Sequence, residues 1–263
     1  MESSENVRTE SEKITMKRFI QNNPTDFVWF IYKANTPLNI SPQSLTKLFM
    51  LGCLISDDNS IRATLNTEFD GEIITNCLVA THKRVLQEIL RVSDRTLLRF
   101  MKESLSSGYL YQNDEGIYCV SDKYFKKHLS KKDLADGEYA IKINIAAYTA
   151  FYDYFATQSH KKMSYFLQLI PYINVNNNVL CSNIFESSKK VNPLSWDDFC
   201  NLIDYGADNL RRIRNTLCSF TLNGKQLISQ ETNNGVKCII INPCLMYFKE
   251  SILTEEVTLN EST

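Results

Sequence analysis

The sequence has few of the residues from which catalytic and metal sites are usually built. Its 263 residues include only 8 glycines and 3 histidines, and the histidines lie far apart in the chain. The glycine-rich loops that hold phosphates, GxxxxGK[ST] and GxGxxG, are absent, as are the HExxH and GxSxG motifs. The 8 cysteines form no CxxC pair, so we expect no structural zinc site. These absences argue against an enzyme and predict no catalytic residue, no metal and no cofactor.

Long hydrophobic runs and a strong net charge are also missing. No apolar stretch approaches the roughly 18 residues of a membrane span, and no signal peptide is evident, so we expect a cytoplasmic protein that binds no membrane. The formal net charge is −1, but eight acids lie in residues 1–12 and 250–263, leaving 28 bases against 22 acids between these tails. We expect both acidic tails to be disordered, and the mildly basic centre is compatible with nucleic-acid binding.

The stretch from Leu86 to Phe125 has the pattern of two helices followed by a hairpin. The predicted helices are His82–Leu90 and Asp94–Ser106, and Ser93 or Asp94 caps the second. The predicted buried stripe of the second helix is Leu97, Leu98, Met101 and Leu105, and its outer face carries Arg95, Arg99, Lys102 and Ser106. A basic outer face of this kind is often only a solvated surface, so it does not by itself predict DNA binding.

The hairpin after the second helix completes a recognisable order of elements. Gly108 ends the helix, and a polar QNDEG tip separates the short strands Tyr109–Tyr111 and Ile117–Val120. Helix, turn, helix and hairpin in this order form a winged helix, whose second helix fits a DNA major groove.

Three other segments of the first 160 residues have interpretable patterns. A helix is predicted to start at Ser41–Pro42 and to run to Ile55, whereas residues 60–80 are ambiguous, with a strand and a loop around Gly71 as one interpretation. Residues 137–160 carry five aromatic residues between Tyr148 and Phe155. They predict a buried helix, and a stacking platform for single-stranded bases is the alternative.

The same pattern returns about 115 residues later, which indicates a duplicated domain. The corresponding segments are HKKMSYFLQLIPYI, then LSWDDFCNLIDYG with Ser195 as its cap, then ADNLRRIRNTLCSF. A shift of 112 positions aligns Leu90, Leu98, Met101 and Leu105 with Leu202, Leu210, Ile213 and Leu217, and aligns Arg99 and Lys102 with Arg211 and Arg214. The second hairpin is predicted from Lys225–Ser229, a tip at Glu231–Gly235, and Val236–Ile241.

We therefore predict a mainly α fold with small β elements (α+β), in which an aromatic-rich helix joins two tandem winged helix-turn-helix domains. The predicted boundaries are a disordered tail at 1–12, domain 1 at 13–135, a connecting helix at 136–160, domain 2 at 161–249, and a disordered tail at 250–263.

The segment VSDRTLLRFMKESLSSGYL is similar to the winged-helix pattern of bacterial regulators and replication initiators. LIPYINVNNNVLCSNIFE and IINPCLMYFKE resemble segments of tandem winged-helix proteins from phages and plasmids of Gram-positive bacteria, among which replication-initiation proteins are the nearest family. The resemblance implies that Ser93, Arg95, Thr96, Arg99 and Lys102 point toward the groove, matched by Tyr205, Ala207, Asp208, Arg211 and Arg214. Asp208 in the place of Thr96 departs from the pattern, because an acid at this edge either accepts from cytosine or is repelled.

The leading hypothesis is a sequence-recognising double-stranded DNA-binding protein, a transcriptional regulator or replication initiator of a phage or plasmid. The candidate DNA-binding residues are Arg91, Ser93, Arg95, Thr96, Arg99, Lys102, Lys123, Lys126, Lys127, Asn209, Arg211, Arg212, Arg214, Asn215 and Lys225. In this interpretation, the lysines between residues 123 and 132 and those near Lys189-Lys190 contact phosphates. The alternative for residues 123–132 is a solvated helix end. The rival function is a protein-interaction module that docks a partner protein, and a homodimer is a further expectation.

Overall fold

The computed structural model describes residues 27–33, 36, 38–69, 72–155, 160–186, 190–222, 224–233, 236–243 and 245–247. These residues form a mixed α+β fold with seven α-helices and small antiparallel sheets. The tails predicted at 1–12 and 250–263 lie outside the described residues, as does Lys189. None of the described helices has the length and hydropathy that crossing a membrane requires.

The elements fall into a first half, residues 27–126, and a second half, residues 138–247. The first half contains β1 (Phe27–Lys33), α1 (Pro42–Gly52), β2 (Arg62–Phe69), β3 (Glu72–Val79), α2 (Lys83–Leu90), α3 (Asp94–Ser106), β4 (Leu110–Gln112), β5 (Tyr118–Val120) and β6 (Phe125–Lys126). The second half contains β7 (Glu138–Asn144), α4 (Ile145–Tyr154), α5 (His160–Leu167), α6 (Trp196–Leu202), α7 (Leu210–Cys218), β8 (Thr221–Leu222), β9 (Lys225–Gln226), β10 (Ile228–Asn233), β11 (Val236–Ile241) and β12 (Met246–Tyr247). Short 3₁₀ turns lie at Lys131–Asp133, Ile170–Tyr172 and Ala207–Asn209.

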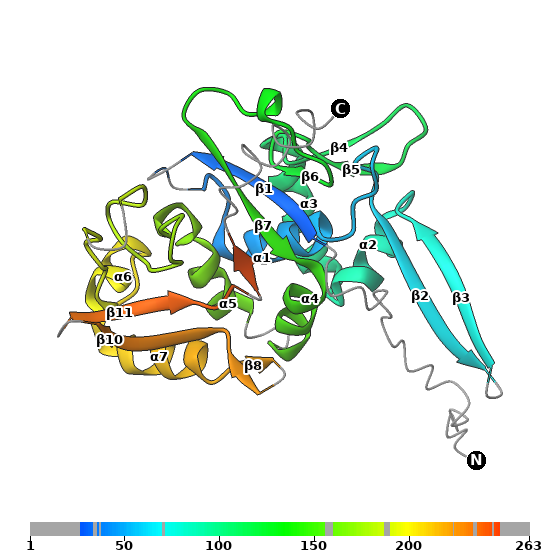
Figure 1. The fold of residues 1–263 in the computed structure, drawn as a ribbon. Coiled ribbons are helices and arrows are strands. Elements are labelled where there is room, and N and C mark those ends of the chain that lie inside the picture. Colours follow the sequence, from blue (N-terminus) through cyan, green and yellow to red (C-terminus); the bar gives the residue numbers. More distant parts are fainter. Residues whose placement is uncertain are drawn as a thin grey trace, which may run out of the picture.

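A four-stranded antiparallel sheet joins the two halves, with strand order β12-β7-β1-β6 (Figure 1). The central strands β1 and β7 pair along their whole length, from Phe27 opposite Asn144 to Lys33 opposite Glu138. Strand β6 pairs with the outer edge of β1, and β12 pairs with the outer edge of β7. The last strand of each half therefore pairs with the first strand of the same half.

The connecting helix predicted over 136–160 is wrong in its first part, because Glu138–Asn144 form strand β7. The sequence of this segment alternates Tyr139, Ile141 and Ile143 with Ala140 and Lys142, and backbone pairing with β1 and β12 makes it a strand. A helix predicted from the composition of one segment takes no account of pairing with strands more than a hundred residues away in the sequence.

The buried helix predicted from the aromatic run is confirmed as α4. Tyr148, Phe151 and Tyr152 lie inside the protein, and their rings are not available as a stacking platform. The Tyr148 hydroxyl donates to the backbone oxygen of Thr46 at 3.0 Å, and the Tyr152 hydroxyl donates to that of Leu90 at 2.9 Å. Helix α4 thus connects to both α1 and α2.

Helix α1 lies at the centre of the molecule and packs against α2, α3, α4 and α5. It begins at Pro42 with Ser41 as its N-cap residue, as the sequence predicts. All residues from 44 to 52 are buried. Gly52 permits this packing, because a Cβ atom there would collide with the ring of Phe125.

Residues 60–80, which fit a strand or a loop by sequence, form a β-hairpin. Strands β2 and β3 pair over eight residues, from Arg62 opposite Val79 to Phe69 opposite Glu72. The ribbon projects away from the body of the molecule (Figure 1), and among the described strands β2 and β3 pair only with each other.

The hydrophobic core extends through both halves. One cluster of buried side chains includes Phe30, Phe49 and Phe125 from the first half and Phe151 and Phe166 from the second. The two predicted domains therefore share both a sheet and a core.

Candidate nucleic-acid interface

The α2–α3 segment has the helix–turn–helix form that the sequence predicts. Helix α2 ends at Leu90, its C-cap residue Arg91 adopts a left-handed conformation with φ 50°, and the chain turns through the buried Val92 into α3. The side chains of Leu86, Ile89 and Leu90 anchor α2 in the core. Helix α3 runs over Asp94–Ser106, the same bounds as predicted.

The buried face of α3 differs from the predicted stripe. Its buried residues are Leu97, Phe100, Met101 and Ser104, whereas Leu98 is 54% exposed and Leu105 is 41% exposed. Leu97, Phe100, Met101 and Ser104 follow the i, i+3, i+4, i+7 spacing of one helical face. Leu98 and Leu105 lie about 100° further round the helix, so they fall on the outer surface.

The cationic outer face of α3 agrees with the prediction. Arg95, Arg99 and Lys102 are all exposed. They share this surface with Leu98 and Leu105, so the outer face of α3 combines three cations with two leucines.

Glu103 fastens α3 to the start of α1. Its carboxylate accepts hydrogen bonds from the backbone N–H of Ser41 and from the hydroxyls of Ser41 and Ser44. Burial raises the pKa of Glu103, but the hydrogen bonds from Ser44 and Ser41 outweigh it, so the net pKa is below the usual value. The orientation of the basic face therefore depends on a charged, hydrogen-bonded contact at its flank, because Glu103 lies one helical turn after Arg99.

A buried lysine lies beside this contact. Lys47 of α1 is 4% exposed, and its amine donates to the backbone oxygen of Gln43. Burial lowers the pKa of Lys47 to about 8; the nearby Glu103 carboxylate acts in the opposite direction and Arg99 acts in the same direction. Arg99 is therefore close to the α1–α3 contact as well as exposed to solvent.

Two of the candidate residues at the start of α3 make local contacts. Ser93 occupies the N-cap position, but its hydroxyl meets the hydroxyl of Thr96 at 3.0 Å and makes no capping bond to the backbone. The prediction that Ser93 caps through its side chain is thus wrong. Arg91 lies 3.6 Å from Asp153 of α4, so this candidate residue is engaged in an ion pair at the edge of the turn.

The lysines that follow the first hairpin differ in their surroundings. Lys126 forms an ion pair with Asp133 at 2.7 Å, and Lys127 is half-buried. Lys123 is exposed. Of these three predicted phosphate contacts, Lys123 has the most accessible side chain.

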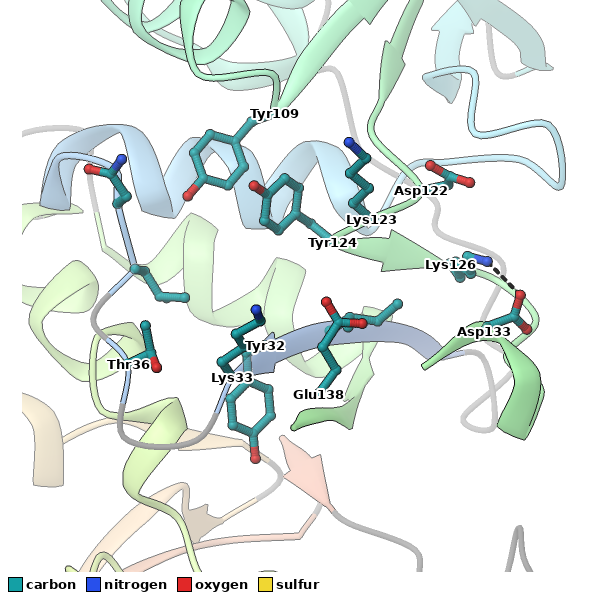
Figure 2. Close-up of a pocket in the computed structure, with 13 residues that line it drawn as sticks. Tyr32, Lys33, Thr36, Tyr109, Asp122, Lys123, Tyr124, Lys126, Asp133 and Glu138 are labelled. Atoms are coloured by element: carbon teal, nitrogen blue, oxygen red, sulfur yellow. Dashed lines mark hydrogen bonds and ion pairs between the residues drawn. The ribbon is translucent and has the colours of Figure 1, made fainter. Parts of the chain in front are cut away.

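Lys123 and Lys126 also line a hollow of about 460 Å³ beside β1 and β6 (Figure 2). Tyr109 and Tyr124 form one wall, with ring centroids 4.3 Å apart, and burial together with Tyr124 raises the pKa of Tyr109 to about 12. The lining mixes three lysines with Asp122, Asp133 and Glu138, so it has no dominant charge. The sequence contains no local signal for this hollow, because its walls come from segments about a hundred residues apart.

In the second half, α6 and α7 follow each other with a short connection between them. Helix α6 begins after Ser195, whose hydroxyl accepts from the backbone N–H of Asp198 while the Asp198 carboxylate accepts from Ser195, as a capping box. The cap predicted at Ser195 is confirmed, and its hydrogen bonds to the Asp198 carboxylate lower the pKa of that group. Helix α7 follows a 3₁₀ turn at Ala207–Asn209, and Ile213 and Leu217 are its buried residues.

The candidate residues of the second half lie on the surface of α7 and on the strand after it. Arg211, Arg212, Asn209, Asn215 and Lys225 are exposed, and Arg214 is half-buried. Asn209 occupies the N-cap position of α7 without a capping bond. Leu202 is 43% exposed although Leu90, its predicted equivalent, is fully buried, so the 112-residue alignment does not hold for burial at that position.

Two asparagines show the likeness of the two halves more closely than the alignment does. Asn59 and Asn178 are each 7% exposed and have φ values of 61° and 57°. The amide of Asn59 donates to the backbone oxygens of Val120 and Phe125, and the amide of Asn178 donates to those of Ile241 and Met246. In both halves, therefore, an asparagine joins the segment after a helix, α1 or α5, to the end of the hairpin and to the closing strand.

The backbone next to each asparagine repeats the same connection. Ser60 bridges to Cys119 of β5, and Val179 bridges to Ile240 of β11. In both halves, therefore, the residue after the asparagine forms one antiparallel bridge to the second strand of the hairpin.

No family model, curated protein or solved structure matches this chain. Among the described residues, no group of three or more His, Cys, Asp or Glu side chains is placed to hold a metal ion.

Proposed function

We propose that this chain is a sequence-recognising double-stranded DNA-binding protein, a regulator or replication initiator of a phage or plasmid, built from two winged helix-turn-helix units. Unit 1 comprises β1 to β6 and unit 2 comprises β7 to β12. The observation that carries the proposal is the exposed arginine face of the second helix in both units, with Arg95 and Arg99 on α3 and Arg211 and Arg212 on α7. We assign the chain no catalytic step and no cofactor.

The order of elements in each unit supports this function. In both units a helix is followed by a bridging residue, Ser60 or Val179, then by two helices, and then by a hairpin whose last strand meets that residue. Unit 1 has the additional hairpin β2–β3 before its two helices, and unit 2 has the additional pair β8–β9 after them. Asn59 and Asn178 stabilise this connection with matching hydrogen bonds. The frame that holds α3 and the frame that holds α7 are therefore alike, and each presents a helix of a size to enter a major groove.

The chemistry of the exposed side chains fits the groove of a duplex. An arginine offers two donors in a fixed geometry that matches O6 and N7 of guanine, and we assign this role to Arg95 and Arg99. Lys102 and Lys123 would neutralise phosphates, which adds affinity without sequence information. Arg91 and Lys126 already meet carboxylates, so we expect smaller contributions from them.

The central sheet supports a particular arrangement of the DNA site. Trp29 lies opposite both Lys142 and Lys126, and Lys142 lies opposite both Trp29 and Tyr247. Trp29 and Lys142 therefore hold equivalent positions in their units. This register is the one expected if an approximate two-fold axis passes through the Trp29–Lys142 pair and relates the two units. Because the symmetry of a DNA-binding protein is mirrored in its operator, we expect one chain to bind an imperfect inverted repeat.

The repeat is expected to be imperfect because the two reading helices differ. Asp208 stands where unit 1 has Thr96, and Arg214 is half-buried where Lys102 is exposed. The two halves of the DNA site should therefore differ in sequence.

The test is selection of bound fragments from random duplexes with the full chain. We expect a site made of two unequal inverted halves, and an affinity that falls steeply as salt rises. Replacing Arg95 and Arg99 together with alanine should lower the affinity for that site about 30-fold or more, since each bidentate contact to guanine contributes about 1–3 kcal/mol.

The matched control is the double variant Arg62→Ala/Arg84→Ala, which removes the same charge from two arginines that are paired with Asp58 and Glu88 outside α3 and α7. It should change the affinity by less than about threefold. The proposed function fails if no duplex is enriched, or if the two double variants lose affinity equally.

The second candidate function is docking of a partner protein, and the exposed Leu98, Leu105 and Leu202 favour it. Leucines on a helix face are common in protein interfaces, where the buried centre of the patch is apolar. This candidate replaces DNA binding if the Arg95/Arg99 double variant loses a protein partner while duplex binding is absent or unchanged.

A further inference from the structure

We propose, on the basis of the DNA-binding function proposed above, that Leu98 is a specificity-determining residue that contacts thymine methyl groups in the half-site of unit 1. Leu98 is 54% exposed, although the sequence pattern predicts it to be buried. It lies in the N-terminal half of α3, three residues after Arg95 and four residues before Lys102, and therefore on the same face as these exposed cations.

A leucine in this position has a chemically specific partner in a major groove. The edges of the bases present mainly hydrogen-bond donors and acceptors there, and the C5-methyl of thymine is the apolar group among them. Arg95, Arg99 and Lys102 provide the charge that brings α3 to the duplex, and Arg95 and Lys102 lie next to Leu98 on the helix surface. The apolar side chain of Leu98 then loses its contact with water only where a methyl group faces it.

Unit 2 lacks this feature. Leu210, which the 112-residue alignment places opposite Leu98, packs against the hydrophobic core. The outer surface of α7 consists of arginine and asparagine side chains, namely Arg211, Arg212 and Asn215. Dependence on thymine methyl groups is therefore expected in one half of the site only, the half that α3 reads.

The test uses the duplex obtained by selection and the full chain. Thymines in each half are replaced one at a time by deoxyuridine, which pairs in the same way but lacks the methyl group. For the wild type, one or two substitutions in the α3 half should each lower the affinity about fourfold, the value that corresponds to about 0.8 kcal/mol for one buried carbon at 1.4 kcal/mol per tenfold. Substitutions in the α7 half should have no effect.

The variant Leu98→Ala should bind the thymine duplex several-fold more weakly and should no longer distinguish thymine from deoxyuridine. Leu98→Met retains an apolar side chain of similar volume and should keep most of the discrimination. Leu105→Ala is the matched control, because Leu105 is also exposed on α3 but lies two turns further from its N-terminus. Leu105→Ala should leave unchanged the ratio between the affinity for the thymine duplex and the affinity for the deoxyuridine duplex.

The inference is overturned if the selected α3 half contains no thymine, if the wild type binds both duplexes equally, or if Leu98→Ala still discriminates as the wild type does. All three outcomes occur with sequence-specific duplex binding intact, so they leave the proposed function standing. If the chain binds no duplex at all, both the proposed DNA-binding function and the role of Leu98 are overturned. Thermal unfolding of each variant establishes that it is folded, which we expect because Leu98 and Leu105 lie outside the core.

Discussion

At the scale of single residues, Asn59 and Asn178 are constrained both in backbone conformation and in side-chain hydrogen bonding. Each has a left-handed backbone, which asparagine tolerates better than most residues with a Cβ atom. Each also donates from a buried amide to two backbone oxygens, at 3.0 and 2.8 Å for Asn59 and at 3.3 and 3.1 Å for Asn178. Backbone conformation and hydrogen bonding therefore both select asparagine at these positions.

Replacing Asn59 should show how much each requirement contributes. Asn59→Gly keeps the backbone conformation but leaves two buried carbonyls without this donor, and we expect a loss of about 2 kcal/mol in the free energy of unfolding. Asn59→Ala adds the cost of a left-handed alanine and should lose about 3 kcal/mol. The same order is expected at Asn178. Urea unfolding measures these values.

Asn201→Ala is the control for these variants, because Asn201 is exposed on α6. It should change the free energy of unfolding by no more than about 0.5 kcal/mol. A value of this size for Asn59→Ala would show that the shared asparagine contacts do not stabilise the fold.

The outward cations could be predicted from the sequence, but other single residues could not. Arg95, Arg99 and Lys102 recur at helical spacing, and that local pattern is enough to place them on one face. The pattern predicts Leu98 in the buried stripe, but Phe100 takes that place, because apolar residues occupy both positions and contact with α1 selects one. The partners of Asn59 lie more than sixty residues away, so no local signal identifies them.

At the scale of elements, the contact between α1 and α3 should depend on pH through Glu103. The net pKa of Glu103 is lowered in the folded protein. A carboxyl group whose pKa is lower in the folded protein stabilises the fold at a pH above its pKa in the unfolded chain, which is about 4.3 for Glu. That stabilisation is lost as the pH falls through the pKa of the folded protein. We therefore expect wild type to be about 1–2 kcal/mol more stable than Glu103→Gln at pH 7, with a difference that shrinks below about pH 4.

Free energies of unfolding between pH 3 and pH 7 provide this measurement. The control is Glu88→Gln, which removes a carboxylate paired only with the exposed Arg84 on the surface of α2, a contact of small energetic value. If the difference between wild type and Glu103→Gln stays constant over this range, the ionised Glu103 does not hold α3 against α1.

The elements that could be predicted from the sequence are those whose ends are determined locally. Ser41 with Pro42 starts α1 and the Ser195 capping box starts α6, and both signals lie within four residues of the helix they begin. Strand β7 was missed because it exists through its pairing with β1 and β12, at opposite ends of the sequence. The β2–β3 hairpin was ambiguous for a similar reason, since the segment alone fits either a strand or a loop.

At the scale of the whole molecule, the sequence predicts a duplicated domain, which stays a prediction, whereas the way in which the two halves join could not be predicted. The repeated pattern of helices and hairpins is visible in the spacing of apolar and basic residues. The pairing of β1 with β7 and the packing of α1 on α5 bring together segments that share no local pattern. They produce a common sheet and a continuous core rather than two bodies on a linker.

Because the two units share a core, we expect them to unfold together, and the fluorescence of the two tryptophans can measure this. Trp29 is 5% exposed in β1 and Trp196 is 7% exposed in α6, so the chain carries one buried tryptophan in each unit. We expect the single-tryptophan variants Trp29→Phe and Trp196→Phe each to unfold in urea with one transition, whose midpoint by fluorescence coincides with that by circular dichroism. The reason is that neither unit can lose its fold without exposing the β1–β7 pair and the α1–α5 contact of the other. Separate midpoints for the fluorescence of unit 1 and unit 2 would instead establish two domains that fold independently, and the rigid placement of α3 relative to α7 on one duplex would then have no structural basis.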